Sequence, residues 1–334
     1  MDDDAPVDAR RRRHPIGRAV AVLGWLVVAG LVGFLVLRVV AYDTRRVTIA
    51  ITAYTPYWFL PIYPVLLFAA LTRRRALILA SAALVMVHVL FVAPRLGAED
   101  VPDEASSSPQ LRVLTANVMS QNTSREALGR ELLGYDADVI ALIEFTPAWS
   151  DTLSALGITE RFPHWVEFHQ KGTQGIAVFS RLPIRDGRIA RAGGRPIARL
   201  DIEVGGEWVH VVAAHPPPPH SDRRALHYEL TRLSDLADDI DGPLVVMGDM
   251  NSTLYNRALR HVLAGDLRCA HDARGRSLFA TSWPNGTRRA PPALIDHVLV
   301  SSDIAVLDVR EGDGEGSDHR PVIADLAILS MAAD

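Results

Sequence analysis

The stretch LVVMGDMNST, residues 244–253, joins an apolar run to the polar residues Asp249 and Asn251. An apolar run that ends in a carboxylate and an amide two positions apart predicts a strand that delivers polar side chains to a sheet edge. The two side chains would then share a face, where their oxygens suit a hard divalent cation or a phosphate group. A tight turn with a capping aspartate is the alternative interpretation of these residues.

Other predicted strands also end in side chains that do chemistry. Asn117 closes LRVLTANV, Glu144 closes DVIALIEF, and His215 follows the strand ending at Ala214. Taken singly, each has an ordinary explanation as a turn former, a helix cap or a histidine before a proline turn. Together they supply oxygen ligands, a general base and imidazoles, which indicates metal-assisted hydrolysis.

The segment GSDHRP near the C-terminus adds Asp318 and His319. Neighbouring residues cannot face one another along a strand, so a carboxylate that orients His319 must come from another segment. Asp296, at the start of the predicted strand 294–301, is the candidate for that hydrogen bond. A solvated loop is the plain alternative for Asp318 and His319.

The elements that must position these residues alternate between strands and helices, which favours an α/β domain. Thr123 and Glu126 have the spacing of a capping box, and Ser221 is a candidate cap for the second helix. An antiparallel pair is predicted around Gly205 and Gly206. The predicted strands are 111–118, 138–145, 175–180, 197–204, 208–214, 294–301 and a last one ending at Leu329, and the predicted helices are 122–135, 221–240 and 257–263.

The chain divides into two parts of opposite charge. Residues 1–97 contain twelve arginines and five aspartates, a net of +7, whereas residues 98–334 contain 23 basic and 34 acidic residues, a net of −11. Three uncharged, mostly apolar stretches of nineteen, twenty-six and nineteen residues separate the arginines of the first part. About 20 helical residues cross a bilayer, so three transmembrane helices are predicted.

We therefore predict a cytoplasmic basic tail over residues 1–18, a three-helix transmembrane region over 19–96, a linker over 97–110 and a catalytic domain over 111–334. Pro56, Pro61 and Pro64 interrupt the second span. Arginines 10–13 and 73–75 belong on the cytoplasmic side by the positive-inside rule, which places the catalytic domain outside the cytoplasmic membrane. The single cysteine, Cys269, allows no internal disulfide.

The ordered segments resemble a known family. LTANV, ALIEF, GIAVFSRLPI, AAH, GDMNST, LIDHVLVS and GSDHRPVIADL follow the order and spacing of the endonuclease/exonuclease/phosphatase superfamily. The resemblance covers about residues 111–329 and implies a DNase I-like α/β sandwich, two packed mixed sheets flanked by helices, here preceded by three transmembrane helices. The architecture also resembles membrane-bound bacterial members, including the type associated with teicoplanin resistance.

The resemblance also implies roles for the polar strand ends. A divalent metal, Mg²⁺ or Mn²⁺, would be held by Glu144 with Asn117 beside it and Asp318 completing the site. Asp249 and Asn251 would position the attacking water and a phosphate oxygen, and Asp296 would orient His319 on the phosphoryl group. His215 would protonate the leaving oxygen. Whether Asp249 or His319 is the general base stays open.

A membrane-tethered outer domain favours a lipid-linked phosphate or diphosphate as substrate and the bacterial cytoplasmic membrane as partner. The alternative is an extracytoplasmic nuclease, which would bind nucleic acid through phosphate contacts. The acidic charge of residues 98–334 disfavours it, although a set of loop arginines could form a local basic patch: Arg191, Arg195, Arg274, Arg276, Arg288 and Arg289. A non-catalytic binding domain is a third interpretation. The oligomeric state is not predicted.

Overall fold

The computed structural model describes residues 15–286 and 290–329, which form two compact units. One contains residues 15–40 and 55–91, and the other contains residues 41–54 and 92–329. Each unit has a hydrophobic core of its own.

The first unit is helical and strongly apolar. Val28, Phe59 and Leu77 contribute to its core. Among the described residues, two helices, 16–40 and 75–95, are long and apolar enough to cross a membrane, and there are up to three candidates if a broken helix pair over 46–71 counts as one span. The helices of this unit are α1 (Pro15–Val40), α3 (Thr55–Trp58), α4 (Ile62–Leu71) and α5 (Arg75–Val92). The short η1 (Ala93–Arg95) that follows α5 belongs to the second unit.

The predicted boundaries differ from the structure at two places. Helix α2 (Arg46–Ala53), expected inside the second span, belongs to the second unit, and it buries the polar side chains of Thr48 and Thr52. The predicted linker 97–110 packs on the same unit, because it forms the short helix η2 (Asp103–Ser106) and buries Ala105 completely. Charge spacing placed α2 in a span, and acidic, Ser- and Pro-rich composition marked 97–110 as a linker, whereas both segments contribute buried side chains in the second unit.

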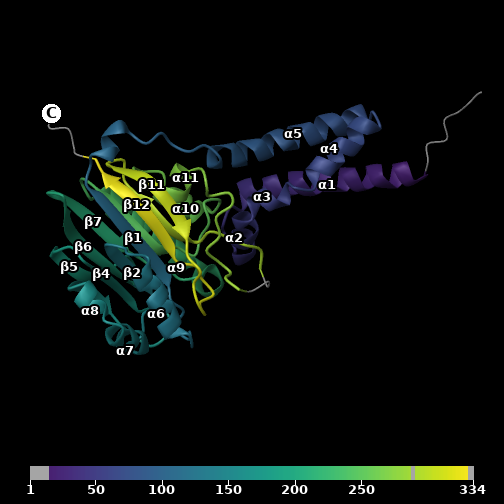
Figure 1. The fold of residues 1–334 in the computed structure, drawn as a ribbon. Helices are drawn as coiled ribbons and strands as arrows, with labels where there is room; N and C mark the ends of the chain where they lie inside the picture. Colours follow the sequence, from purple (N-terminus) through teal and green to yellow (C-terminus); the bar gives the residue numbers. More distant parts are fainter. Residues whose placement is uncertain (1–14, 287–289, 330–334) are drawn as a thin grey trace, which may run out of the picture. The chain divides into compact units, whose positions relative to one another are not determined.

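The second unit is built on two six-stranded mixed sheets (Figure 1), which confirms the predicted α/β sandwich. In the first sheet, β1 pairs parallel to β2 and antiparallel to β12, and in the second, β7 pairs parallel to β8. The first sheet has the order β11 (Ile304–Glu311), β12 (Val322–Ile328), β1 (Gln110–Asn117), β2 (Val139–Ile143), β4 (Ile176–Ser180) and β3 (His164–Phe168). The second has the order β5 (Ile184–Arg191), β6 (Pro196–Val204), β7 (Glu207–Ala213), β8 (Leu244–Asp249), β10 (Asp296–Val300) and β9 (Arg268–Cys269).

Alternation along the strands explains how the sheets pack. In β8, Val245 and Met247 enter the core between the sheets, whereas Leu244 and Val246 enter the core beneath the helices on the outer face. Successive side chains of a strand point to opposite faces, so a strand buried on both faces reads as one apolar run. Each predicted strand is either buried on both faces or half-buried. Strands β3, β5, β9 and β11 were not predicted.

Helices cover both outer faces. The helices α6 (Arg125–Gly134), α7 (Pro147–Ala155) and α8 (Ile158–Arg161) share a core with β1, β2 and β4. Two more, α9 (Pro219–Asp238) and α10 (Arg257–Val262), cover β7 and β8. The short α11 (Ala270–Ala273) contributes to the core between the sheets.

Two predicted helix starts differ from the observed ones. Helix α6 has Ser124 as its N-cap, without a side-chain cap bond, in place of the Thr123 capping box. In α9, Asp222 interrupts the helix with non-helical backbone angles, and its carboxylate accepts hydrogen bonds from the backbone N–H groups of Arg224 and Ala225. Asp222 therefore caps the main part of the helix that Ser221 was predicted to cap.

Gly248 allows the end of β8 to approach the end of β7. Its φ is 144°, and an added Cβ would lie 2.0 Å from the carbonyl oxygen of Ala214. We expect Gly248→Ala to lower the thermal unfolding midpoint of the purified protein by about 4–10 °C. Gly206→Ala is the control, since Gly206 has a positive φ but open space around it. Equal shifts in the two variants would show that this close approach is not required.

Candidate active site

Three polar residues continue the inward-facing series of their strands. Asn117 follows Leu111 and Val113 in alternation along β1, and Asp249 follows Val245 and Met247 along β8. Asp296 precedes Val298 and Val300 in β10 in the same way. The alternation therefore brings three polar side chains from both sheets to the end of the core between them.

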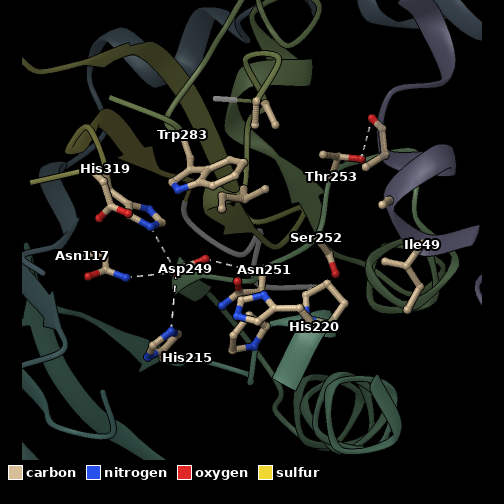
Figure 2. A pocket seen from close by; sticks show the side chains of 18 of the residues that line it. Ile49, Asn117, His215, His220, Asp249, Asn251, Ser252, Thr253, Trp283 and His319 are labelled. Atoms are coloured by element: carbon tan, nitrogen blue, oxygen red, sulfur yellow. Dashed lines mark hydrogen bonds and ion pairs between the residues drawn. The ribbon is translucent and has the colours of Figure 1, made fainter. Parts of the chain in front are cut away.

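Asp249 is the centre of this group. Its side chain is 2% exposed, and its Oδ2 accepts a hydrogen bond of 3.0 Å from the amide Nδ2 of Asn117. The same Oδ2 lies 3.5 Å from His215 Nε2 and 3.8 Å from His319 Nε2. Figure 2 shows Asn117, His215 and His319 converging on Asp249 from three directions. A single carboxylate oxygen is thus surrounded by an amide and two imidazoles.

His319 is oriented by Asp296, as predicted from the sequence. Its Nδ1 lies 2.8 Å from Asp296 Oδ2, and both side chains are buried. Ser317 fixes the loop that carries His319, because its hydroxyl donates to the carbonyl of Asn117 and accepts from the backbone N–H of His319. The Nε2 of His319 is therefore directed towards Asp249.

The charges of the three groups depend on one another. Burial disfavours a charged imidazole, but the carboxylates of Asp296 and Asp249 outweigh it and raise the pKa of His319 to about 10. Burial also acts on Asp249, where His319 and His215 overcome it and hold the pKa of the carboxyl below its usual range. Asp296 stands directly opposite Asp249 in the β8–β10 register, and burial together with that neighbouring charge raises its pKa.

His215 is held by contacts that the sequence did not indicate. Its Nδ1 lies 3.0 Å from the carbonyl oxygen of Thr173 and 3.1 Å from Arg195 NH1. The backbone N–H of Arg195 in turn donates to the buried carboxylate of Glu229 on α9. Arg195 was predicted in a basic surface patch, and the structure places it beside His215. No local sequence signal marks this contact, because the three segments are distant in the chain.

The other described arginines of the predicted patch have separate partners. Arg191 donates to the carbonyl of Gly194, Arg274 donates to the carbonyl of Glu99, and Arg276 pairs with Asp308 at 2.7 Å. Arg288 and Arg289 lie outside the described residues.

Asn251 combines the two interpretations of the GDMN segment. Strand β8 ends at Asp249, and Asn251 has a φ of 48°, so the two residues do not share a strand face as expected. The backbone N–H of Asn251 donates to Asp249 Oδ1 at 2.9 Å, and its amide donates to the carbonyl of Pro216. The segment is therefore a turn with a capping aspartate, and that turn keeps Asn251 at the site.

Glu144 reaches the site through an unusual backbone conformation. It follows Ile143 at the end of β2, and its φ of 62° breaks the alternation of the strand. One carboxylate oxygen accepts the backbone N–H of Ser120 at 2.9 Å, and the other lies 3.4 Å from Asn117 Nδ2. The carboxylate is half-buried, and its Oε1 has only the long contact with Asn117, so this oxygen can serve as a hard ligand for a cation.

Two sets of residues bear on a metal ion. Asp249, Asp296 and His319 offer ligand atoms within 4.8 Å of one another, which is close enough to hold one ion. In this set, His319 Nδ1 is already used by Asp296, whereas Asp296 Oδ1 is buried without a hydrogen-bond partner. The predicted ligands Asn117, Glu144 and Asp318 all line the same cavity. The donors at this site therefore fit a divalent cation.

The cavity that contains the site has a volume of about 710 Å³. The predicted residues line it together with others that the sequence did not indicate, among them Ile49, Ala50 and His220. In Figure 2, Ile49 lies on helix α2, on the opposite side of the view from Asn117 and His319. The cavity thus has a polar end at Asp249 and an apolar end that includes α2.

Comparisons with known proteins agree with the fold. TDP2 from Caenorhabditis elegans is 13% identical with a TM-score of 0.56, over 65% of this chain and 98% of that one. TDP2 from D. rerio, solved with a single-stranded DNA product, is 16% identical with a TM-score of 0.55, over 65% and 98% of the two chains. An endonuclease/exonuclease/phosphatase family protein from Bacteroides thetaiotaomicron is 14% identical with a TM-score of 0.53, over 67% and 99%.

The curated proteins include none that matches this sequence. The model of the Endonuclease/Exonuclease/phosphatase family, in contrast, matches residues 114–319, which contain all eight predicted site residues. That segment is more than half of the chain and runs from β1 to His319. The chain therefore belongs to the endonuclease/exonuclease/phosphatase family.

Proposed function

We propose that this protein is a membrane-anchored, metal-dependent phosphoesterase that cleaves a lipid-linked phosphate or diphosphate outside the cytoplasmic membrane. The observation that carries the proposal is the convergence of Asn117, His215 and His319 on the buried Asp249 carboxylate, at one end of a cavity of about 710 Å³. Such a site holds charged groups ready for a phosphoryl centre before any substrate enters.

The side chains divide the chemistry between them. Asp249, held as a carboxylate, accepts the proton of the attacking water, which leaves His319 to donate from Nε2 to a phosphoryl oxygen. His319 suits this role because Asp296 fixes its ring and because its raised pKa keeps it charged. His215 then delivers a proton to the leaving oxygen, a contribution worth about 10²–10⁴ in rate.

A divalent cation, Mg²⁺ or Mn²⁺, fits the hard oxygen donors of Glu144, Asn117 and Asp318. When bound, it neutralises negative charge that develops on the phosphoryl oxygens. Glu144 is the central ligand of the proposal, because its carboxylate is half-buried and only weakly engaged by Asn117.

The chain connection supports three membrane crossings. We call the second unit, which contains the site, the catalytic unit. The chain leaves it after Tyr54 and returns to it at Val92. Both segments must lie on one side of the membrane, so residues 55–91 must cross it an even number of times. Helix α5 is long enough for one crossing. We assign the second crossing to residues 55–71, the part of the broken helix pair that lies outside the catalytic unit, at about the minimum length. With the arginines of the basic tail and of residues 73–75 inside, the catalytic unit lies outside.

The membrane anchor and the acidic charge of the catalytic unit support a lipid-linked substrate over nucleic acid. Residues 98–334 carry a net charge of −11, which gives no general attraction to a polyanion. A nuclease is the second candidate, because the D. rerio TDP2 of the same fold was solved with a DNA product. A non-catalytic binding domain is disfavoured, since all the predicted polar positions line one cavity or contact His319.

The purified full-length protein in detergent tests these functions. With Mg²⁺, we expect phosphate release from a polyprenyl diphosphate or cleavage of a phosphodiester lipid, and no cleavage of plasmid DNA. EDTA should abolish turnover, and Glu144→Gln should raise the Mg²⁺ concentration for half-maximal activity by about tenfold or more, since a charged ligand is lost. Cleavage of DNA alone would overturn the lipid proposal, and EDTA-resistant turnover would overturn the metal proposal.

A further inference from the structure

Residues 41–54, between α1 and α3, are held in the catalytic unit by buried polar contacts. Asp43, 1% exposed, accepts hydrogen bonds from the backbone N–H of Arg257, the amide of Asn256 and the hydroxyl of Thr52. Asn256 is also buried, and its amide donates to the carbonyl of Ile49 at 3.0 Å. A buried carboxylate with several donors is costly to break and fixes one arrangement of its segment.

Contacts from other elements hold both ends of the segment. His227 on α9 lies 3.0 Å from the carbonyl oxygen of Asp43, and Arg46 donates to the carbonyl of Ser221 at 3.2 Å. At the other end, the hydroxyl of Thr253 donates to the carbonyl of Ala53, and that of Tyr54 donates to the carbonyl of Pro291. Helix α2 is therefore a fixed part of the catalytic unit.

This helix forms an apolar wall of the active-site cavity, which we call the α2 wall: Ile49, Ala50, Ala53 and Tyr54. Trp283, Pro291 and Ile295 line the same cavity and add to its apolar surface. Figure 2 shows Ser252 and Thr253, just after the catalytic Asp249–Asn251 turn, on the side of the cavity that faces α2. A molecule with its phosphate at Asp249 would therefore present its remainder to apolar side chains.

The chain connection adds a second observation. Val40, the last residue of α1, precedes the segment directly, and Tyr54 of the α2 wall is bonded to Thr55, the first residue of α3. The segment 41–54, which carries the wall, is thus the covalent link between two parts of the apolar helical unit.

We propose that the α2 wall binds the hydrocarbon chain of the substrate and makes the site selective for phosphoesters that carry one. This inference rests on the proposed function and adds the element that selects the substrate. Asp43 acts as a positioning residue, because it holds α2 in place without lining the cavity. The selective surface is therefore outside the segment 114–319 that defines the family.

A series of p-nitrophenyl alkyl phosphates tests the proposal with the full-length protein in one detergent. Water attacks phosphorus, the bond to the nitrophenyl oxygen breaks, and nitrophenol and an alkyl phosphate form, so methyl, butyl and octyl esters share one reaction. Burying a methylene favours binding by up to about fourfold. We expect kcat/KM to rise by about tenfold or more from the methyl to the octyl ester, mainly through KM.

Matched variants on α2 assign the chain-length effect. Ala50→Glu places a charge on the α2 wall, and we expect it to reduce the octyl-to-methyl ratio of kcat/KM by about tenfold. Val47→Glu is the control, because Val47 is 66% exposed on the same helix and does not line the cavity. Asp43→Ala should raise KM for the octyl ester and so lower the octyl-to-methyl ratio of kcat/KM. Asp43→Asn keeps a hydrogen-bond acceptor and should restore much of that ratio.

Binding of octylphosphonate, which has no ester bond, gives a readout that does not require turnover. The α2 wall predicts tighter binding of octylphosphonate than of methylphosphonate, and a weaker preference in Ala50→Glu. If the protein binds in this way but hydrolyses no ester, the proposed function is wrong and the wall stands. Two results would overturn the proposal that the α2 wall binds the hydrocarbon chain. One is turnover without chain-length dependence, and the other is an equal octyl-to-methyl ratio of kcat/KM in Ala50→Glu and Val47→Glu.

Discussion

Asp249→Ala is expected to lower kcat by about 10³–10⁴ on whichever phosphoester the wild-type protein cleaves. The substitution removes the carboxylate on which Asn117, His215 and His319 converge, so the proton acceptor for water and the alignment of both imidazoles are lost together. The measurement is single-turnover and steady-state hydrolysis with the full-length protein at saturating metal.

The fold should survive this change. Asp249 lies at the end of β8 and belongs to none of the hydrophobic cores of the catalytic unit. Active-site residues are commonly selected for function at some cost in stability, so we expect a thermal midpoint within a few degrees of wild type. Asp249→Asn keeps the shape and should be nearly as inactive, because an amide is not a base. Near-wild-type turnover in either variant would remove Asp249 from the mechanism.

Asp296→Ala is expected to lower kcat by about 10²–10⁴, with a much smaller effect on KM. Asp296 accepts from His319 Nδ1 at 2.8 Å and thereby sets both the tautomer and the direction of the ring. In the serine-protease triad, removal of the orienting carboxylate costs about 10⁴ in kcat while the geometry persists. Loss of Asp296 also removes one of the two carboxylates that keep the His319 imidazole protonated.

A second aspartate–histidine pair in the same unit serves as the control. Asp201 and His210 lie on neighbouring strands, with 2.6 Å between the carboxylate and Nδ1, and neither residue lines the active-site cavity. Asp201→Asn should leave kcat within about twofold of wild type, since surface-proximal substitutions have small effects. If both variants lose activity equally, the effect of Asp296 is one of stability and not of orientation.

Much of the candidate site could be predicted from the sequence because strand alternation is a local rule. The series Val245, Met247 and Asp249 fixes the face on which Asp249 lies as soon as β8 is recognised. The same rule excluded Asp318 as the partner of His319 and pointed to Asp296, and the structure contains that hydrogen bond. Order along the chain then sufficed for the family, since the polar strand ends occur in a characteristic sequence.

Backbone departures from that rule were not predictable from alternation. Glu144 and Asn251 both have positive φ, so their side chains leave the faces that the strands would assign to them. Positive φ is rare outside glycine and is maintained by surrounding contacts, here Ser120 for Glu144 and Pro216 for Asn251. Their roles as a metal ligand and a phosphate-positioning residue remain predictions from the family resemblance.

The sequence by itself determined the sandwich, the polar ends of its strands and the apolar helices before it, because periodicity and residue type are local properties. Only the tertiary structure decided what surrounds Asp249. It places Arg195 in contact with His215 Nδ1, and it makes α2 a wall of the cavity. Helix α2 reads as part of a membrane span because its composition is apolar. The buried Asp43 and its contacts with Asn256 and Arg257, more than 200 residues away, assign it to the catalytic unit. Contacts over such separations depend on how the chain folds back, which no local pattern records.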